Sequence, residues 1–124
     1  METQKRGYKS RAAFKLLQIN DKYNFLLPGL AVIDLGCAPG GWLQIASQKV
    51  GSKNGSEKVV GVDLLPTDDI PGCKSIIGDI INRNTGKDLI KILGCKPNIV
   101  VSDMAANTTG PVSYTHLRAH ETRI

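Results

Sequence analysis

The stretch Asp34-Leu-Gly-Cys-Ala-Pro-Gly-Gly-Trp42 decides the fold. It continues residues 31–35, a short and mostly apolar run with β-branched members, which is typical of a strand buried in a parallel sheet. It leads into residues 42–50, whose apolar side chains recur at helical spacing until Gly51. Glycines between a strand and a helix let a ligand approach the backbone closely and leave the first helical N–H groups without partners. The stretch therefore predicts a ligand site at a strand–loop–helix junction, built on Gly36, Gly40 and Gly41.

Further strands and helices alternate on both sides of this junction. We expect strands at residues 59–63, 74–77 and 98–101, and helices at residues 10–22 and 88–93. Asn84 or Thr85 is the expected cap of the last helix, which Gly94 ends. Such alternation predicts right-handed βαβ units and an open parallel sheet. The predicted fold class is therefore α/β and Rossmann-like, with about four parallel strands and flanking helices.

The glycine loop also fits a dinucleotide-binding pattern. Gly36, Ala38 and Gly41 match G-x-A-x-x-G, and Asp63 lies 22 residues after Gly41, close to the spacing of an acid that binds a ribose. The spacing alone therefore leaves a nicotinamide-dependent dehydrogenase open.

Acidic side chains mark the end of each predicted strand. Asp34 lies near the end of the first strand and Asp63 ends the second, while Asp79 and Asp103 follow the third and fourth. The carboxyl ends of parallel strands are where such sheets bind ligands. Asp34 can meet a ligand ammonium group but would repel a pyrophosphate. Asp63 suits ribose hydroxyls and Asp79 suits an adenine amino group. A rim with four acids and no cation favours a cationic ligand, such as S-adenosylmethionine with its ammonium and sulfonium.

The N-terminal part of the chain is basic. Residues 1–30 hold six cations and two acids, whereas residues 31–110 hold eight of each. The helix that Ser10 is expected to cap has an apolar face of Ala13, Phe14, Leu16, Leu17 and Ile19. Its narrow polar stripe consists of Arg11, Lys15, Gln18 and Lys22. A basic arm on a neutral body indicates contact with a polyanion, and a merely solvated N-terminus is an equally good reading of the charge alone.

Length and composition restrict the remaining classes. The 124 residues suffice for one small domain, and 41% hydrophobic with 22% charged residues is ordinary for a globular protein. No apolar run approaches the roughly 20 residues of a membrane span, and the start lacks the apolar stretch of a secretory signal. The cysteines Cys37, Cys73 and Cys95 show no paired spacing, so we expect reduced thiols and no metal site.

Five motifs occur together in one order and spacing. They are Gly7-Tyr-Lys-Ser-Arg-Ala-Ala-Phe-Lys-Leu-Leu17, Asp34 to Trp42, Gly61-Val-Asp-Leu-Leu-Pro66, Gly78-Asp79, and Ser102-Asp-Met-Ala-Ala-Asn-Thr-Thr-Gly110. Over residues 7–110 the chain thus resembles the FtsJ/RrmJ family of ribosomal RNA 2′-O-methyltransferases, whose members methylate a uridine ribose in large-subunit rRNA. Cys37 and Ala106 stand where the family more often has alanine and proline.

The resemblance implies a methyltransferase fold, S-adenosylmethionine as cofactor, and specific site residues. The family's cofactor pocket uses residues that match Gly40, Trp42, Asp63, Asp79 and Asp103. Its catalytic Lys-Asp-Lys-Glu set begins with residues that match Lys15 and Asp103. Asp103 would then meet the methionine end of the cofactor or hold a catalytic ammonium in place. Trp42 would pack at the pocket edge or in the core. Lys15 would anchor the target nucleotide, with Arg11 and Lys22 on neighbouring phosphates.

The resemblance also implies that the chain is incomplete. We expect a basic arm and helix at 1–30, the N-terminal part of the methyltransferase domain at 31–110, and a non-native tail at 111–124. His116 and His120 of this tail lack a third metal ligand. The chain would end before the family's second lysine and its glutamate, leaving the fourth strand as an open edge and the fragment without methyl transfer.

Several functions remain open beside rRNA methylation. A methyltransferase of the same fold could act on tRNA or an mRNA cap, and the chain by itself could be a non-catalytic module that binds cofactor or RNA. The expected partner is rRNA within the large ribosomal subunit, without a membrane. The family reading favours a monomer in the cytoplasm, or in the mitochondrial matrix of a eukaryote.

Overall fold

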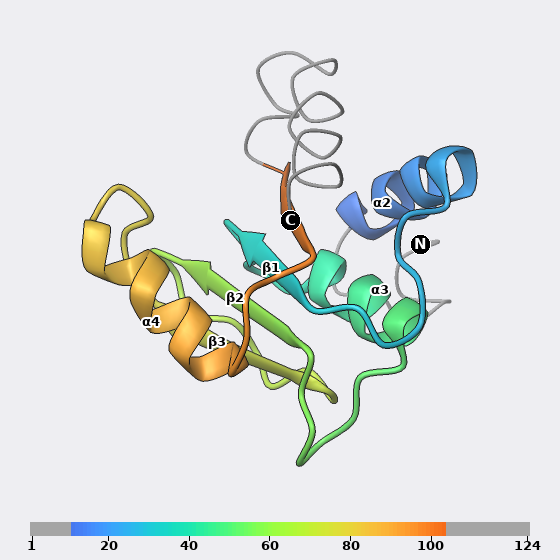
Figure 1. The fold of residues 1–124 in the computed structure, drawn as a ribbon. Helices are drawn as coiled ribbons and strands as arrows, with labels where there is room; N and C mark the ends of the chain where they lie inside the picture. The colour runs from blue at the N-terminus through green and yellow to red at the C-terminus, as the bar shows by residue number, and fades with distance from the viewer. Residues whose placement is uncertain (1–10, 104–124) are drawn as a thin grey trace.

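A computed structural model describes residues 11–103 and shows a parallel sheet with helices on both faces (Figure 1). The strands are β1 (Val32–Leu35), β2 (Val59–Asp63), β3 (Cys73–Ile77) and β4 (Ile99–Ser102), and the helices are α2 (Ala12–Tyr23), α3 (Gly41–Val50) and α4 (Arg83–Leu93). All strand pairs are parallel, and the order across the sheet is β3-β2-β1-β4. The predicted α/β class with four parallel strands is confirmed.

Two apolar layers hold the helices on the sheet. Because side chains alternate along a strand, one residue in two faces α2 and α3, and the others face α4. Val32, Val59 and Ile99 belong to the layer beneath α2 and α3. The opposite layer is formed by Ala31, Ile33, Val60, Val62, Leu89, Leu93 and Val100. Burial on both faces explains why the strand sequences are almost continuously apolar.

Helix α2 packs against α3 and is tied to the following chain by a side chain that the sequence analysis did not single out. The predicted face of α2 is confirmed, since Ala13, Leu16 and Ile19 are buried and Phe14 is half-buried. Asn20 is buried among them, and its Oδ1 accepts hydrogen bonds from the N–H groups of Phe25 and Leu26 at 3.0 and 2.8 Å. This amide therefore fixes the direction in which the chain leaves α2.

The helix caps differ from the predictions. Helix α4 begins earlier than expected, because Asn82, and neither Asn84 nor Thr85, is its cap and accepts a hydrogen bond from the Asn84 N–H at 2.9 Å. The Thr85 hydroxyl instead donates to the Asp79 carbonyl at 2.7 Å. Arg11 stands at the N-cap of α2 without a capping side chain, and Ser10 lies outside the described residues.

Several lysines after residue 30 lie at the ends of helices or just before strands. Lys49 and Lys91 occupy the last turns of α3 and α4, while Lys58 immediately precedes β2 and Lys96 lies three residues before β4. Since helices run antiparallel to the strands of such a sheet, all four lie on the side opposite the strands' carboxyl ends. Lysines in a last turn also complement the partial negative charge of the helix C-terminus.

The remaining expectations concern edges, thiols and membranes. Strand β4 lies at one edge of the described sheet, next to β1. Cys37, Cys73 and Cys95 are free thiols, and residues 11–103 contain no cluster suited to a metal. Within the same range no helix has the length and apolarity needed to cross a bilayer. The tail at 111–124, with His116 and His120, lies outside the described residues.

Gly61 permits the close approach of β2 to the glycine loop and α3. A Cβ at this position would lie 2.7 Å from Cys37 Cβ and 2.9 Å from Leu43 Cδ2. We expect Gly61→Ala to lower the free energy of unfolding by about 1–3 kcal/mol, because these groups are themselves closely packed. Urea denaturation measures the change. The matched control is Gly86→Ala in α4, where a Cβ meets nothing within 4 Å and should stabilise by about 0.5–1 kcal/mol. Equal effects of the two substitutions would contradict this account of Gly61.

Candidate functional site

The carboxyl ends of three adjacent strands bring three acids together. Asp34 of β1 pairs in register with Gly61 of β2 and with Val101 of β4. Asp63 lies two residues beyond Gly61 in β2 and therefore faces the same side of the sheet, which α2 and α3 cover. Asp103 follows the last residue of β4 and lies on the same side, because it lines a cavity together with Ala12 of α2 and Trp42 of α3. Burial is the main cause that raises the pKa of Asp34, and the neighbouring charges of Asp103 and Asp63 raise it as well.

The predicted glycine loop joins β1 to α3 beside these acids. Its first N–H groups, those of Gly36 and Cys37, donate to the Val62 carbonyl at 2.7 and 3.0 Å, so that β2 holds the loop in place. Gly40 is the N-cap of α3 with a φ of 121°, which side chains other than glycine rarely adopt. A Cβ on Gly40 would also lie 3.0 Å from Ile70 Cδ1. Both the conformation and the packing therefore require glycine at this position.

Asp63 connects the loop to the end of β2. Its Oδ2 accepts a hydrogen bond from the Ala38 N–H at 2.9 Å, and its Oδ1 accepts one from the Leu65 N–H at 3.0 Å. Each carboxylate oxygen has a second lone pair. The two backbone bonds thus orient Asp63 and still leave acceptor capacity for the hydroxyls of a ligand.

Asp34 lies deeper than its sequence position suggested. The side chain is fully buried, and neither carboxylate oxygen has a hydrogen-bond partner in the described structure. Burial, together with the charges of Asp103 and Asp63, raises the pKa of Asp34 to about 8. The expected direct contact between this carboxyl and a ligand ammonium therefore stays a prediction, while its position behind the ligand edge is clear.

Asp103 borders a small cavity of about 80 Å³ beside the glycine loop. Its buried Oδ1 has no hydrogen-bond partner in the described structure. Trp42 lines the same cavity and is also part of the apolar layer, with its ring only 3% exposed. Its Nε1 donates to the Ala12 carbonyl of α2 at 2.6 Å. Trp42 therefore lies both at the edge of the cavity and in the apolar core.

Asp79 is the outermost of the four predicted acids. It follows β3, is exposed, and its Oδ1 accepts a hydrogen bond from the Ile81 N–H at 3.0 Å. The Gly78 N–H donates to the Asp63 carbonyl at 2.9 Å, which keeps the ends of β2 and β3 together. Exposed apolar side chains follow Asp63 and Asp79 in the sequence, namely Leu64 and Leu65 after the first and Ile80 and Ile81 after the second. Exposed acids flanked by exposed apolar side chains can offer both polar and apolar contacts to a ligand.

The predicted RNA-facing cations lie on the exposed side of α2. Arg11, Lys15 and Lys22 are all exposed, as the polar stripe required, and the Lys22 ammonium lies 5.5 Å from the ring centre of Tyr23. Lys15 is one helical turn beyond Ala12, which borders the same cavity as Asp103. Helix α2 therefore begins at the ligand edge.

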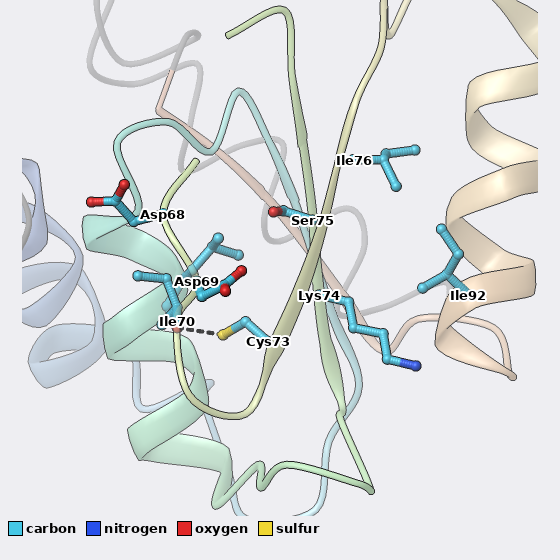
Figure 2. Close-up of a pocket in the computed structure, with 9 residues that line it drawn as sticks. Asp68, Asp69, Ile70, Cys73, Lys74, Ser75, Ile76 and Ile92 are labelled. Carbon is cyan, nitrogen blue, oxygen red and sulfur yellow. Dashed lines mark hydrogen bonds between the residues drawn. The ribbon is translucent and has the colours of Figure 1, made fainter. Parts of the chain in front are cut away.

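A larger cavity, of about 430 Å³, lies along β3 and is lined by Asp68 and Asp69, whereas Asp34, Asp63 and Asp103 do not line it (Figure 2). It contains Cys73, whose thiol donates to the Leu43 carbonyl at 3.3 Å and whose pKa burial raises to about 12. Such a thiol is not a nucleophile near neutral pH. Because this cavity lacks the glycine loop and the convergent carboxyls, the smaller cavity is the better candidate site.

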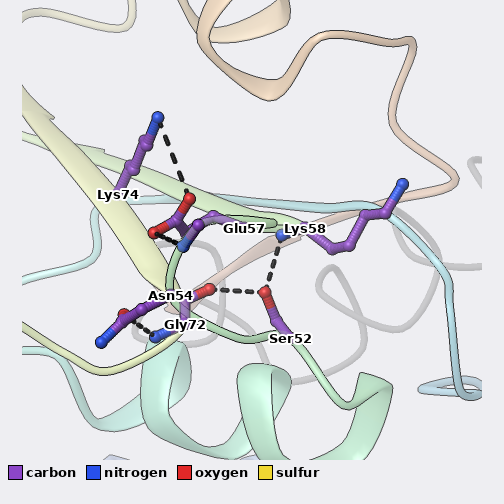
Figure 3. A network of polar contacts seen from close by, with 7 residues as sticks. Ser52, Asn54, Glu57, Lys58, Gly72 and Lys74 are labelled. Atoms are coloured by element: carbon purple, nitrogen blue, oxygen red, sulfur yellow. Dashed lines mark hydrogen bonds and ion pairs between the residues drawn. The ribbon is translucent and has the colours of Figure 1, made fainter.

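A polar network fixes the loop between α3 and β2 to the start of β3 (Figure 3). The Ser52 hydroxyl donates to the Gly72 carbonyl and accepts from the Lys58 N–H at 2.7 Å, while the Gly72 N–H donates to Asn54 Oδ1 at 2.9 Å. Glu57 lies 3.9 Å from the Lys74 ammonium and accepts a hydrogen bond from the Gly55 N–H, which lowers the pKa of Glu57. This network is far along the strands from the acids and has a structural role.

Three residues of the site escaped the sequence analysis. Thr67 and Ile70 pack against Gly40, and the Thr67 hydroxyl lies 3.3 Å from Cys37 Sγ. Both belong to the irregular segment after β2, in which no periodic pattern marks an inward side chain. Ala12 contributes a backbone carbonyl, which no side-chain pattern could reveal.

Comparisons with known proteins agree with this geometry. Residues 8–122 match the FtsJ-like methyltransferase family. The chain is 50% identical over 112 residues to proteins of Bartonella tribocorum and Brucella ovis, each named ribosomal RNA large subunit methyltransferase E. These alignments cover 90% of this chain but only 46% and 47% of the relatives, so the chain spans about half of their length.

A solved structure shows the same fold. A crystal structure from Plasmodium falciparum, described as that of a ribosomal RNA methyltransferase, superposes with a TM-score of 0.66 at 30% sequence identity. The match covers 91% of this chain and 69% of that protein. Together with the family match over most of the sequence, the strand order and the glycine loop, this likeness decides the family. The chain belongs to the FtsJ-like methyltransferases.

Proposed function

We propose that this chain forms the cofactor-binding part of an S-adenosylmethionine-dependent enzyme that methylates a ribose 2′-hydroxyl, that of a uridine, in large-subunit ribosomal RNA. The observation that carries the proposal is the convergence of Asp34, Asp63 and Asp103 on one face of the sheet, beside a glycine loop. Acids without compensating cations favour a positively charged ligand over a diphosphate. The names of the relatives support ribosomal RNA as the substrate class.

The side chains of the edge fit the parts of the proposed cofactor. Asp63 is oriented by two backbone N–H groups and suits the ribose hydroxyls, whereas the exposed Asp79 suits the adenine amino group. The buried, unpartnered Oδ1 of Asp103 suits the ammonium of the methionine end. Gly36 and Gly41 border the small cavity, where side chains would hinder the close approach of the ligand, and Gly40 gives the loop its conformation. A bound S-adenosylmethionine would supply a methyl group carried on a sulfonium.

The chemistry requires alignment and proton removal more than any other assistance. The family's catalytic set matches Lys15 and Asp103 in this chain. Helix α2 carries Lys15 one turn beyond Ala12, which borders the Asp103 cavity. In our proposal Lys15 anchors the target nucleotide at this edge, and Asp103 orients the ammonium groups there. In our proposal the large ribosomal subunit is the partner, and the protein acts where this subunit is found, in the cytoplasm or in the mitochondrial matrix of a eukaryote.

The RNA in this proposal lies along α2. Arg11, Lys15 and Lys22 share the exposed stripe of the helix. Cations in such a row bind successive phosphates and position the strand without reading its sequence. The acids at the strand ends would repel the same phosphates, so that only the target ribose is expected to reach the cofactor.

Calorimetric titration tests the cofactor. We expect S-adenosylhomocysteine to bind and NAD to show no binding. Asp63→Asn should weaken the homocysteine analogue about tenfold or more, because a charged acceptor for the ribose is replaced by a neutral one. Asp88→Asn on the exposed face of α4 is the matched control and should bind like the unchanged chain. Tight binding of NAD without a response to the analogue would refute the proposal.

The salt dependence of RNA binding tests the α2 stripe. With a single-stranded fragment of large-subunit rRNA, Arg11→Ala, Lys15→Ala and Lys22→Ala should each reduce the slope of log K against log salt by about 0.7, because each removes one phosphate contact. Lys87→Ala on α4 removes an exposed cation from the other side of the sheet and should leave the slope unchanged. An equal decrease for Lys87→Ala would show that the stripe has no special role.

Labelled-methyl transfer identifies the substrate. A protein that joins this chain to the remaining length of its relatives should label undermethylated large ribosomal subunits and leave tRNA and capped RNA unlabelled. Lys15→Ala should reduce the labelling at least about hundredfold, since the target nucleotide loses its anchor. Lys87→Ala again serves as control. Preferential labelling of tRNA or capped RNA would overturn the assignment to rRNA.

A further inference from the structure

Asp34 is an ionisable residue whose buried environment disfavours the charged form of its carboxyl group. Its side chain is fully buried between the sheet and the α2–α3 layer, and neither oxygen has a hydrogen-bond partner in the described structure. Leaving an ionised carboxylate in such surroundings is costly unless it is paired or hydrogen-bonded. The group must therefore carry a proton or lie near a positive charge.

The groups around Asp34 supply no such charge. Asp63 and Asp103 face it from the ends of β2 and β4, and the neutral thiols of Cys37 and Cys73 lie on the loop and on β3. The two helices on this face turn their charged side chains to the solvent; these are Arg11, Lys15, Asp21, Lys22 and Lys49. Within residues 11–103, the surroundings of Asp34 thus add negative charge to a desolvated acid.

We propose that Asp34 is protonated while the carboxyl edge of the sheet is empty, and that it releases this proton when a cationic group of the ligand settles in the cavity beside Asp103. This inference rests on the proposed function, because it takes the ammonium of the methyl donor as the cation. The bond that breaks is the O–H of Asp34, and its proton passes to the solvent. The ligand ammonium keeps its own protons, so that binding and deprotonation are balanced.

In this proposal Asp34 loses its proton because the ligand brings a positive charge to the carboxyl edge of the sheet. Without a ligand, burial and the two neighbouring acids hold the pKa of Asp34 at about 8. Asp103 lines the cavity of about 80 Å³ and is close enough for its charge to raise the pKa of Asp34. A cation in this cavity would therefore act on Asp34 with the opposite sign and favour its ionised form. Such a cavity is large enough for an ammonium-sized group, since water occupies about 30 Å³ in the liquid.

The protonated state can be tested without any ligand. A folded pKa of about 8 against an unfolded value of 3.8 means that the folded chain holds one proton more between these values. The contribution of Asp34 to stability is therefore fully present below about pH 4 and is lost as the pH rises toward 8, with the unfolding constant growing up to tenfold per pH unit from this group. Asp34→Asn, which cannot ionise, should remove this dependence, whereas the exposed Asp79→Asn should retain it. Urea unfolding at several pH values measures both.

Carbon-13 carboxyl NMR of the unchanged chain makes the same test independent of how Asp34→Asn folds. One aspartate signal should titrate near pH 8. Titration of every aspartate below pH 5 would overturn the inference.

Proton release on binding is tested by calorimetry with S-adenosylhomocysteine at pH 6.5, in two buffers of different ionisation enthalpy. The ligand amine is protonated at this pH, so the released proton is that of the protein. We expect about one proton per bound ligand for the unchanged chain and none for Asp34→Asn. Asp79→Asn should bind more weakly and release the same number. Binding without proton release would refute this inference and leave the proposed cofactor intact. Absence of binding by the unchanged, folded chain would instead refute the proposed function.

Discussion

A carboxyl group buried without a partner is the constraint on which the rest of this structure depends. Asp34 occupies the centre of the sheet, flanked by β2 and β4, at a point where an apolar side chain would pack without cost. The fold tolerates the acid only by neutralising it. Its surroundings suit an external positive charge: a small cavity bordered by Gly36, Gly41 and Asp103 lies nearby, and the cations of α2 and α3 are exposed to the solvent.

The glycine loop owes its shape to its neighbours as much as to its own sequence. The Val62 carbonyl binds its first two N–H groups, Asp63 binds the Ala38 N–H, and Ile70 packs on Gly40. These contacts couple the glycine loop to β2 and to the segment after β2, so that a movement of the loop would disturb both. A site of this kind is largely formed before the ligand arrives, which reduces the entropy lost on binding.

Much of this arrangement could be predicted from the sequence. Strands were found because buried parallel strands are almost wholly apolar, and the acids at their ends because each interrupts such a run. The cap at Asn82 was missed because neighbouring Asn84 and Thr85 are equally good capping types, and only the backbone geometry distinguishes them. Asn20 was missed because it is a polar residue on an apolar helix face, and Thr67 because it lies in an irregular segment 30 residues from its partner Cys37. The burial of Asp34 results from the packing of α2 and α3 on the sheet, which the local spacing of residues does not predict.

The separation of lysines from aspartates along the strands has a consequence for encounters with other molecules. The body formed by residues 31–103 has equal numbers of cations and acids, yet Lys58 and Lys96 lie at the amino ends of strands whose carboxyl ends are at Asp63 and Asp103. A neutral object of this kind has a dipole moment, and a polyanion exerts a torque on it. Taken alone, this dipole would turn the amino ends of the strands toward an approaching nucleic acid, so that the cations of α2 are what bring the carboxyl edge to the RNA in our proposal.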